Sequence, residues 1–290
     1  MKDRPALLFV VIVALASIPF YYLAVHYHGG TFKLMWVPTI ATILTFAIVK
    51  RDLRTLGWSW GPWRYEWLAF LIPLAYCAIA YGIIWSAGWG GFYDAKFIAK
   101  TRDSLGFQGW SDLAMLAYFI PTTAIYGLPG SLSSALGEEI GWRGFLVPEL
   151  SRSMSFTGVA LTSGVIWFTW HLPVILLGNY HNNSPAALPL AGQLLMFFIC
   201  VVGAAIIMAY LRLKSGSLWT GAIFHATHNL VIQAVLNPLT VNYADTPKYI
   251  DELGLVLPLT IVPFAIYFLI RGQREFATYP SVAPAPSPAV

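Results

Sequence analysis

The stretch from Leu188 to Leu211 reads LPLAGQLLMFFICVVGAAIIMAYL and contains no Asp, Glu, Lys or Arg. About 20 apolar residues in a helix cross the ~30 Å hydrocarbon core of a bilayer, so this stretch predicts a transmembrane helix. Comparable apolar runs recur along the chain, and we predict about eight spans in all. The other seven runs are Ala6–His26, Leu34–Val49, Trp67–Trp85, Leu113–Leu150, Val159–Leu177, Leu218–Leu236 and Leu255–Ile270.

The composition supports the same fold class. Hydrophobic residues make up 58% of the 290 residues and charged residues 10%, and the mean hydropathy is +0.66. A soluble domain carries about 25% charged residues, so this chain encodes too little polar surface for a water-soluble protein. We predict an all-α, polytopic membrane helix bundle, with one multi-span domain over residues 1–275. The Pro- and Ala-rich residues 276–290 are predicted to form a disordered tail.

The fourth apolar run, from Leu113 to Leu150, is too long for one straight crossing. Proline removes a backbone donor and disturbs the preceding helical turn. Pro121, Pro129 and Gly130 are therefore expected to kink or break this segment. Seven or nine spans remain as alternatives to eight.

The positions of Lys and Arg indicate the orientation, because cytoplasmic loops carry an excess of both. With eight spans and a cytoplasmic N-terminus, twelve of the 17 Lys and Arg residues lie inside and five outside. We therefore expect a multi-pass protein of the cell membrane, surrounded by lipids, with both termini cytoplasmic. No basic stripe indicates nucleic-acid binding. Cys77 and Cys200 lie in apolar runs, as expected of reduced, buried thiols.

Two of the 13 acidic residues stand apart from the rest. Glu138 and Glu139 lie inside the apolar stretch Leu136–Leu146, where a charge costs about 2.5–3.5 kcal/mol, and acids at such depth are functional candidates. Glu139 is four residues before Arg143 and can pair with it on one helix face, whereas Glu138 points elsewhere. Alternatively, both acids only tie helices together. The eleven acids assigned to loops or span ends are Asp3, Asp52, Glu66, Asp94, Asp103, Asp112, Glu149, Asp245, Asp251, Glu252 and Glu275.

Histidines in two further apolar runs lie at a similar depth. His171 lies deep in the fifth run, and His225 and Asn229, four residues apart, share a helix face in the seventh. At about 1.5 Å per residue, both histidines and Glu138 fall in the middle part of the bilayer. We therefore predict that these polar groups meet at one site. His228 could join them or turn away.

Two hydrolytic chemistries fit this set of residues. In the first, Glu138 takes a proton from a water that His171 also holds, and the water attacks a peptide carbonyl. His225 and Asn229 then donate hydrogen bonds to the developing oxyanion. In the second, Glu138, His171 and His225 bind a divalent metal such as zinc, which activates the water. The sequence favours the first, without a cofactor, because it contains no His-Glu-x-x-His motif.

Three motifs occur in order on three apolar segments. They are Glu138-Glu139-x-x-x-Arg143-Gly144, Trp167-x-x-x-His171-Leu172-Pro173 and His225-x-x-x-Asn229. In this order they resemble the CPBP family, which comprises CAAX proteases, bacteriocin-processing enzymes and abortive-infection (ABI) intramembrane proteases. The resemblance covers residues 132–236, which we interpret as the catalytic core of the membrane domain.

The resemblance implies a multi-helix fold around a conical intramembrane cavity that opens to the cytoplasm. It also implies an endopeptidase that acts on a membrane-associated or lipidated peptide or protein. Carried over by motif, Glu138 is the catalytic base and His171 helps to hold the water. His225 and Asn229 form the oxyanion site.

The same resemblance implies a structural, supporting role for Glu139 and Arg143. The chain departs from the family pattern at Trp167, where the family often has Phe. Because both side chains are large and aromatic, we expect the difference to alter packing more than chemistry. His228 lies outside the motif.

A different class of protein could use the same residues without catalysis. Buried carboxylates and imidazoles also form proton relays, and helices interrupted at positions such as Pro121 and Pro129 occur in transporters. The alternative is therefore a transporter, or a bacteriocin-immunity or scaffold protein that binds a proton, an ion or a peptide. A protease requires its polar residues around one water-sized site, whereas a transporter requires a path to both sides.

Overall fold

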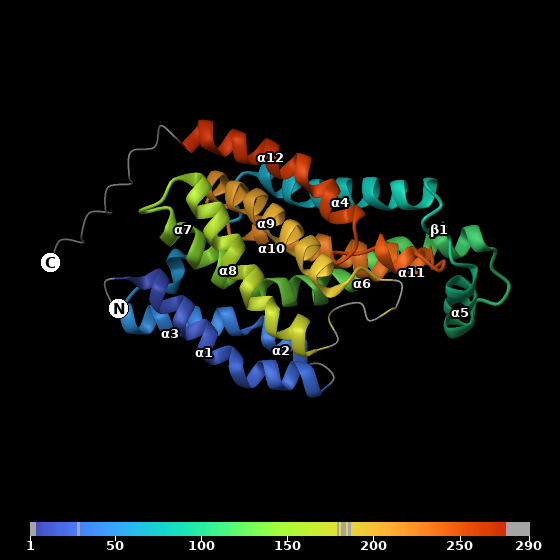
Figure 1. The fold of residues 1–290 in the computed structure, drawn as a ribbon, viewed down its shortest axis with the longest axis horizontal. Helices are drawn as coiled ribbons and strands as arrows, with labels where there is room; N and C mark the ends of the chain where they lie inside the picture. The colour runs from blue at the N-terminus through green and yellow to red at the C-terminus, as the bar shows by residue number, and fades with distance from the viewer. Residues whose placement is uncertain (1–3, 28–29, 179, 181–183, 185–186, 277–290) are drawn as a thin grey trace.

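The chain folds as a bundle of long helices (Figure 1). The computed structural model describes residues 4–27, 30–178, 180, 184 and 187–276. Within these residues, seven helices are long and apolar enough to cross a membrane, which confirms the all-α polytopic fold. They are α1 (Pro5–His26), α2 with α3 (Gly30–Met35 and Val37–Val49), α4 (Trp63–Ser86), α6 with its extension (Asp112–Leu150), α8 (Phe156–Leu177), α9 (Leu190–Ser215) and α12 (Val256–Phe276).

The remaining predicted span is helical but more polar than the seven. It carries His225, His228, Asn229 and Gln233, which lower its hydropathy. It consists of α10 (Trp219–Asn229), the π-helix η3 (Leu230–Leu236) and α11 (Asn237–Leu239). Of the predicted tail, Phe276 is the last residue of α12, and residues 277–290 lie outside the described chain.

The long fourth segment is continuous rather than broken. Helix α6 (Asp112–Glu139) passes through both Pro121 and Pro129, so of the predicted kink or break, the break is wrong. Proline is tolerated inside membrane helices because neighbouring helices and Ser or Thr side chains satisfy the freed backbone groups. The irregular part comes later. It consists of the π-helix η2 (Ile140–Leu146) and the short α7 (Val147–Leu150).

Helix α9 lies at the centre of the bundle and packs against α8, α10 and α12. Small residues allow two of these crossings to be close. A Cβ atom on Gly164 of α8 would lie 3.1 Å from the Cβ of Ala205, and one on Gly203 would lie 3.0 Å from Ile261 of α12. Small residues at helix crossings let backbones approach closely in membranes, where packing drives association.

The two ends of the bundle differ in what they carry. Helix α1 begins and α12 ends at the left in Figure 1, and Gln273 of α12 donates to Thr157 near the start of α8 at 3.0 Å. We call this the terminal end. The chain links α1 to α2, and α8 to α9, at the opposite end, which also holds the segment before α12. We call that the connector end.

A small structure stands at the connector end, at the right of Figure 1. Residues 88–111 contain an amphipathic helix that buries Ile98 and is capped by Asp94. The elements of this structure are β1 (Gly91–Phe92), α5 (Ala95–Leu105), β2 (Thr240–Val241) and η4 (Thr246–Lys248), and β1 pairs antiparallel with β2. Elsewhere in the chain, the short helix η1 (Leu53–Leu56) follows α3.

Both cysteines are free and buried, as predicted. Cys77 lies on α4 and Cys200 on α9.

Candidate active site

Close backbone contacts fix the position of Glu138 at the end of α6. Gly137 faces the end of α2, where a Cβ atom would lie 2.7 Å from the carbonyl oxygen of Met35. Gly141 faces the start of α3, where a Cβ atom would lie 2.6 Å from Pro38. Thr39 donates from its hydroxyl to the carbonyl of Gly137 at 2.7 Å. The π-helix η2 then begins at residue 140, and such turns occur frequently at functional sites.

The carboxylate of Glu138 is 1% exposed and is held by two indoles. Trp167 donates from Nε1 to Oε2 of Glu138 at 2.7 Å, and Trp142 donates to the same oxygen at 3.2 Å. Trp167 in place of Phe therefore brings an N–H donor to Glu138 in addition to packing, which the sequence did not predict. Since both indoles use Oε2, Oε1 is the oxygen that can accept from a water.

The neighbouring Glu139 lies in a sealed ion-pair cluster. Arg143 donates from Nη1 to Oε1 of Glu139 at 2.8 Å, which confirms the predicted pair, and both side chains are buried. His225 brings its Nδ1 to 3.1 Å from the same oxygen. Helix α10 comes this close because Gly221 has no side chain: a Cβ there would lie 2.8 Å from Oε2 of Glu139. The guanidinium of Arg143 lies 4.3 Å over the ring of Trp167.

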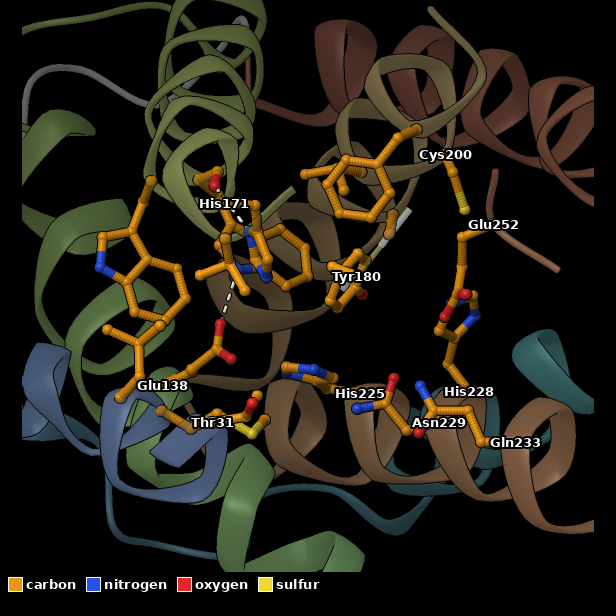
Figure 2. A pocket seen from close by; sticks show the side chains of 18 of the residues that line it. Thr31, Glu138, His171, Tyr180, Cys200, His225, His228, Asn229, Gln233 and Glu252 are labelled. Carbon is orange, nitrogen blue, oxygen red and sulfur yellow. Dashed lines mark hydrogen bonds and ion pairs between the residues drawn. The ribbon is translucent and has the colours of Figure 1, made fainter. Parts of the chain in front are cut away.

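Glu138, His171, His225 and Asn229 all line one cavity of about 160 Å³ (Figure 2). The sequence-predicted site is therefore assembled in space from α6, α8 and α10. In Figure 2, Glu138 and His171 lie at one side, with His225 and Asn229 next along the cavity. The cavity is smaller than the ~300 Å³ of the smallest drug-sized pockets, so it admits an extended chain or a side chain rather than a bulky ligand.

The hydrogen bonds of the two histidines define which ring nitrogens face the cavity. Nδ1 of His171 lies 2.9 Å from the carbonyl of Trp167, and a carbonyl only accepts, so Nδ1 carries a proton there. In the neutral imidazole, Nε2 of His171 is then an acceptor for a water proton. His225 donates from Nδ1 to Glu139 by the same reasoning, so its Nε2 donates only in the imidazolium form, which the carboxylate of Glu139 stabilises.

Asn229 is the last residue of α10, and the π-helix η3 begins directly after it. The Glu138-Glu139 motif precedes η2 in the same way. A widened helical turn thus follows directly after the acidic pair and directly after Asn229. Nothing in the hydrophobic pattern signals these widened turns.

A second polar group lines the same cavity and was not predicted. His228 brings Nε2 to 3.4 Å from Oε1 of Glu252 and Nδ1 to 2.6 Å from the hydroxyl of Tyr76. Glu252 lies between η4 and α12, as predicted for a loop acid, yet it is only 8% exposed. Its assignment to the ordinary loop acids is therefore incomplete. The only sequence signal was the second histidine beside Asn229.

The cavity opens toward the connector end. The two exposed residues of its lining are Thr31 at the start of α2 and Gln233 on η3, and the half-exposed Tyr180 follows α8 at the same end. The lining residues toward the terminal end, Met208 and Phe224, are at most 1% exposed. The cavity is therefore accessible from the end of the bundle that lies opposite the start of α1 and the end of α12.

The alternative metal set, Glu138, His171 and His225, fits a metal ion incompletely. Both histidines donate from Nδ1 to a second partner, as metal-bound histidines do. Across the described part of the chain, however, no three His, Cys, Asp or Glu side chains converge closely enough to hold a metal ion. We therefore derive no step through a metal.

Known proteins match the segment that contains these motifs. Residues 120–231 match the family described as Type II CAAX prenyl endopeptidase Rce1-like. The CAAX prenyl protease 2 of Methanococcus maripaludis is 30% identical over 100 residues, which are 34% of this chain and 36% of that protein. The matched segment overlaps the motifs that resemble the CPBP family, and we call residues 120–231 the CPBP segment. The CPBP segment holds Glu138, His171, His225 and Asn229, whereas Glu252 lies beyond it, and the chain matches about a third of the relative's length.

Proposed function

We propose that this protein is an intramembrane endopeptidase that hydrolyses a peptide bond in a membrane-associated or lipidated peptide or protein. The observation that carries the proposal is the convergence of four side chains from three helices on one buried cavity. The match of the CPBP segment to CAAX prenyl endopeptidases supports the reaction class. A transporter requires a path to both sides, and the buried Met208 and Phe224 at the terminal end of the cavity favour the protease.

The proposed reaction uses Glu138 as the general base. A water between Oε1 of Glu138 and Nε2 of His171 gives a proton to Glu138 while its oxygen bonds to the peptide carbonyl carbon. The carbonyl oxygen becomes an oxyanion that accepts hydrogen bonds from the His225 imidazolium and the Asn229 amide, each contributing about 3–4 kcal/mol. Glu138 then passes its proton to the amide nitrogen, the C–N bond breaks, and an acid and an amine are released.

In this mechanism Glu139 and Arg143 act through His225 rather than on the substrate. The carboxylate of Glu139 keeps His225 charged and oriented, and Arg143 compensates the second charge of this buried cluster. Trp142 and Trp167 orient the general base by fixing Oε2. Their roles are positional.

We also propose that the protein lies in the cell membrane with both termini cytoplasmic, as the Lys and Arg distribution predicts. In that orientation the cavity mouth at the connector end faces away from the cytoplasm. The cytoplasmic opening that the family resemblance implies is incompatible with this orientation. To decide between them, Thr31→Cys at the mouth and Lys50→Cys after α3 are compared in a Cys77→Ser, Cys200→Ser background. A membrane-impermeant maleimide should label Thr31→Cys in intact cells, and Lys50→Cys only after permeabilisation.

The function is tested with the full chain in lipid nanodiscs and N-acylated fluorogenic peptides. We expect Glu138→Gln to abolish cleavage and to retain bound substrate, which mass spectrometry of the captured complex identifies. The matched control is Glu149→Gln, which removes an acid paired with Arg51 at 2.6 Å away from the cavity. Full cleavage by Glu138→Gln excludes the proposed base. Cleavage that survives exhaustive chelation supports the mechanism without a metal.

A further inference from the structure

The cavity has a second polar end that the proposed reaction does not use. Figure 2 shows His228 and Glu252 across the cavity from Glu138, with Asn229 between the two ends. Burial alone raises the pKa of Glu252, but its contacts with His228 lower that pKa below its ordinary value, so the side chain is a carboxylate at neutral pH. A buried carboxylate is costly unless it is paired or hydrogen-bonded, so its retention calls for an explanation.

The partners of Glu252 compensate its charge only in part. The 3.4 Å between Nε2 of His228 and Oε1 of Glu252 is longer than the 2.7–2.9 Å of a strong charge-assisted hydrogen bond. The hydroxyl of Tyr76 lies against Nδ1 of the same ring at 2.6 Å. With Nδ1 of His228 taken by Tyr76, the ring has only Nε2 left for Glu252. The amide of Gln233 is a further donor to Glu252, and it is neutral.

Three other acids, Glu139, Glu149 and Glu275, differ from Glu252 in having a full cation at close range. Glu139 has Arg143 at 2.8 Å and Glu149 has Arg51 at 2.6 Å. Glu275 has Lys214 at 2.7 Å. None of the described residues that line the cavity is a Lys or an Arg, and two of them, Glu138 and Glu252, are carboxylates. Even with His225 counted as the imidazolium of the proposed mechanism, two carboxylates face one positive charge, so the lining is net negative, which attracts a cationic group and repels an anionic one.

Resting on the proposed function, we infer that His228 and Glu252 form a subsite for a positively charged group of the substrate, an alkylammonium or a guanidinium. The group would come from a Lys or Arg side chain near the scissile bond or from a free N-terminus. A peptide whose carbonyl lies at His225 and Asn229 would carry its neighbouring residues toward Glu252, because these residues follow one another along the cavity (Figure 2). Peptides with an acidic residue at that place would be excluded.

Binding to the inactive Glu138→Gln protein in nanodiscs tests the subsite without cleavage. N-acetylated peptides carry Lys, norleucine or Glu at one varied position, and a further peptide carries norleucine with a free N-terminus. We expect the preferred Lys peptide to bind about tenfold more tightly than its norleucine counterpart, as one charge-assisted hydrogen bond provides, and the Glu peptide to bind most weakly. Equal affinity of the Lys, norleucine and Glu peptides at every position overturns the proposal. Tight binding of the free-amine peptide instead assigns the cation to the N-terminus.

Adding Glu252→Gln to Glu138→Gln should reduce the tenfold preference to about twofold or less. Asp245→Asn is the matched control, because Asp245 is an exposed acid of the same connector that pairs with Lys248 at 2.6 Å outside the cavity. A charge preference that Glu252→Gln leaves intact overturns the subsite. The comparison of the peptides on the Glu138→Gln protein stands even if the double variant does not fold. Charge-selective binding without cleavage by the wild type overturns the protease alone, whereas cleavage without charge preference overturns the subsite alone.

Discussion

Glu138 and Glu139 are adjacent in the sequence and equally buried, yet the regions around them differ. Neutral indole N–H groups hold Glu138 at the wall of a cavity. The cationic Arg143 and the imidazole of His225 hold Glu139 in a packed cluster. This difference in hydrogen-bond donors suits Glu138 to reactivity and Glu139 to stability. A carboxylate bound by neutral donors keeps its negative charge for a proton, whereas one bound by a guanidinium is committed to the ion pair.

Replacing each acid in turn by Gln gives the strongest test of whether Glu138 serves reactivity and Glu139 stability. We expect Glu138→Gln to lower the cleavage rate by about a thousandfold, within the 10²–10⁴ range of general acid–base catalysis. Its free energy of unfolding should change by less than about 1 kcal/mol, since Gln still accepts from both indoles. Fluorogenic cleavage and denaturant unfolding in detergent micelles measure the two quantities. A destabilised Glu138→Gln protein would contradict the comparison.

The reverse pattern is expected for Glu139→Gln. It leaves the buried guanidinium of Arg143 without its counter-ion, which costs about 3–5 kcal/mol of stability when one partner of a buried pair is removed. Cleavage should also fall, because His225 loses the carboxylate that stabilises its imidazolium. Unfolding under the same conditions as Glu138→Gln gives the direct contrast. Equal stability of the two variants would mean that the surroundings of the acids do not define their roles.

The indole donors are tested by Trp167→Phe, which keeps an aromatic ring and removes the N–H at 2.7 Å from Glu138. We expect about a tenfold loss of kcat, because a hydrogen bond to a charged group contributes about 1.5–3 kcal/mol. Trp85→Phe is the control: it makes the same change on α4, where Nε1 donates to Thr240 at 3.1 Å outside the cavity. Equal kcat values for Trp167→Phe and the wild type would return Trp167 to a packing role.

The smallest effect is expected at Thr39, whose hydroxyl donates to the carbonyl of Gly137 beside Glu138. Thr39→Val preserves the shape and removes this bond, at a cost of about 1 kcal/mol of stability. Cleavage should fall only a few fold, because the glycine contacts of α6 still position the motif. Measurement of both quantities shows whether the backbone at Gly137 is held redundantly. A loss as large as that of Glu138→Gln would show that it is not.

The sequence predicts the features that depend on periodicity and on local spacing. Hydrophobic runs located the spans, and the four-residue interval from Glu139 to Arg143 predicted a pair that the structure contains. Depth within the apolar segments placed Glu138 and His171 at the same level, and both line the cavity. These properties are local, since each follows from one helix at a time.

The features that the sequence missed depend on contacts between distant segments. The hydrogen bond from Trp167 to Glu138 requires the crossing of α6 and α8, and the burial of Glu252 requires the connector before α12 to fold back over α10. The continuity of α6 through Pro121 likewise depends on its surroundings. No residue pattern within one segment carries this information.

The unbroken course of α6 has a consequence for the shape of the protein in a cell. With its extension to Leu150 it contains 39 residues, about 58 Å at 1.5 Å per residue, against a hydrocarbon core of about 30 Å. Even at a tilt of about 40° it is longer than this core, so the start of α6, where α5 packs against it, reaches past the hydrocarbon. This part of the helix offers an antibody fragment or a fiducial tag a rigid attachment point for imaging.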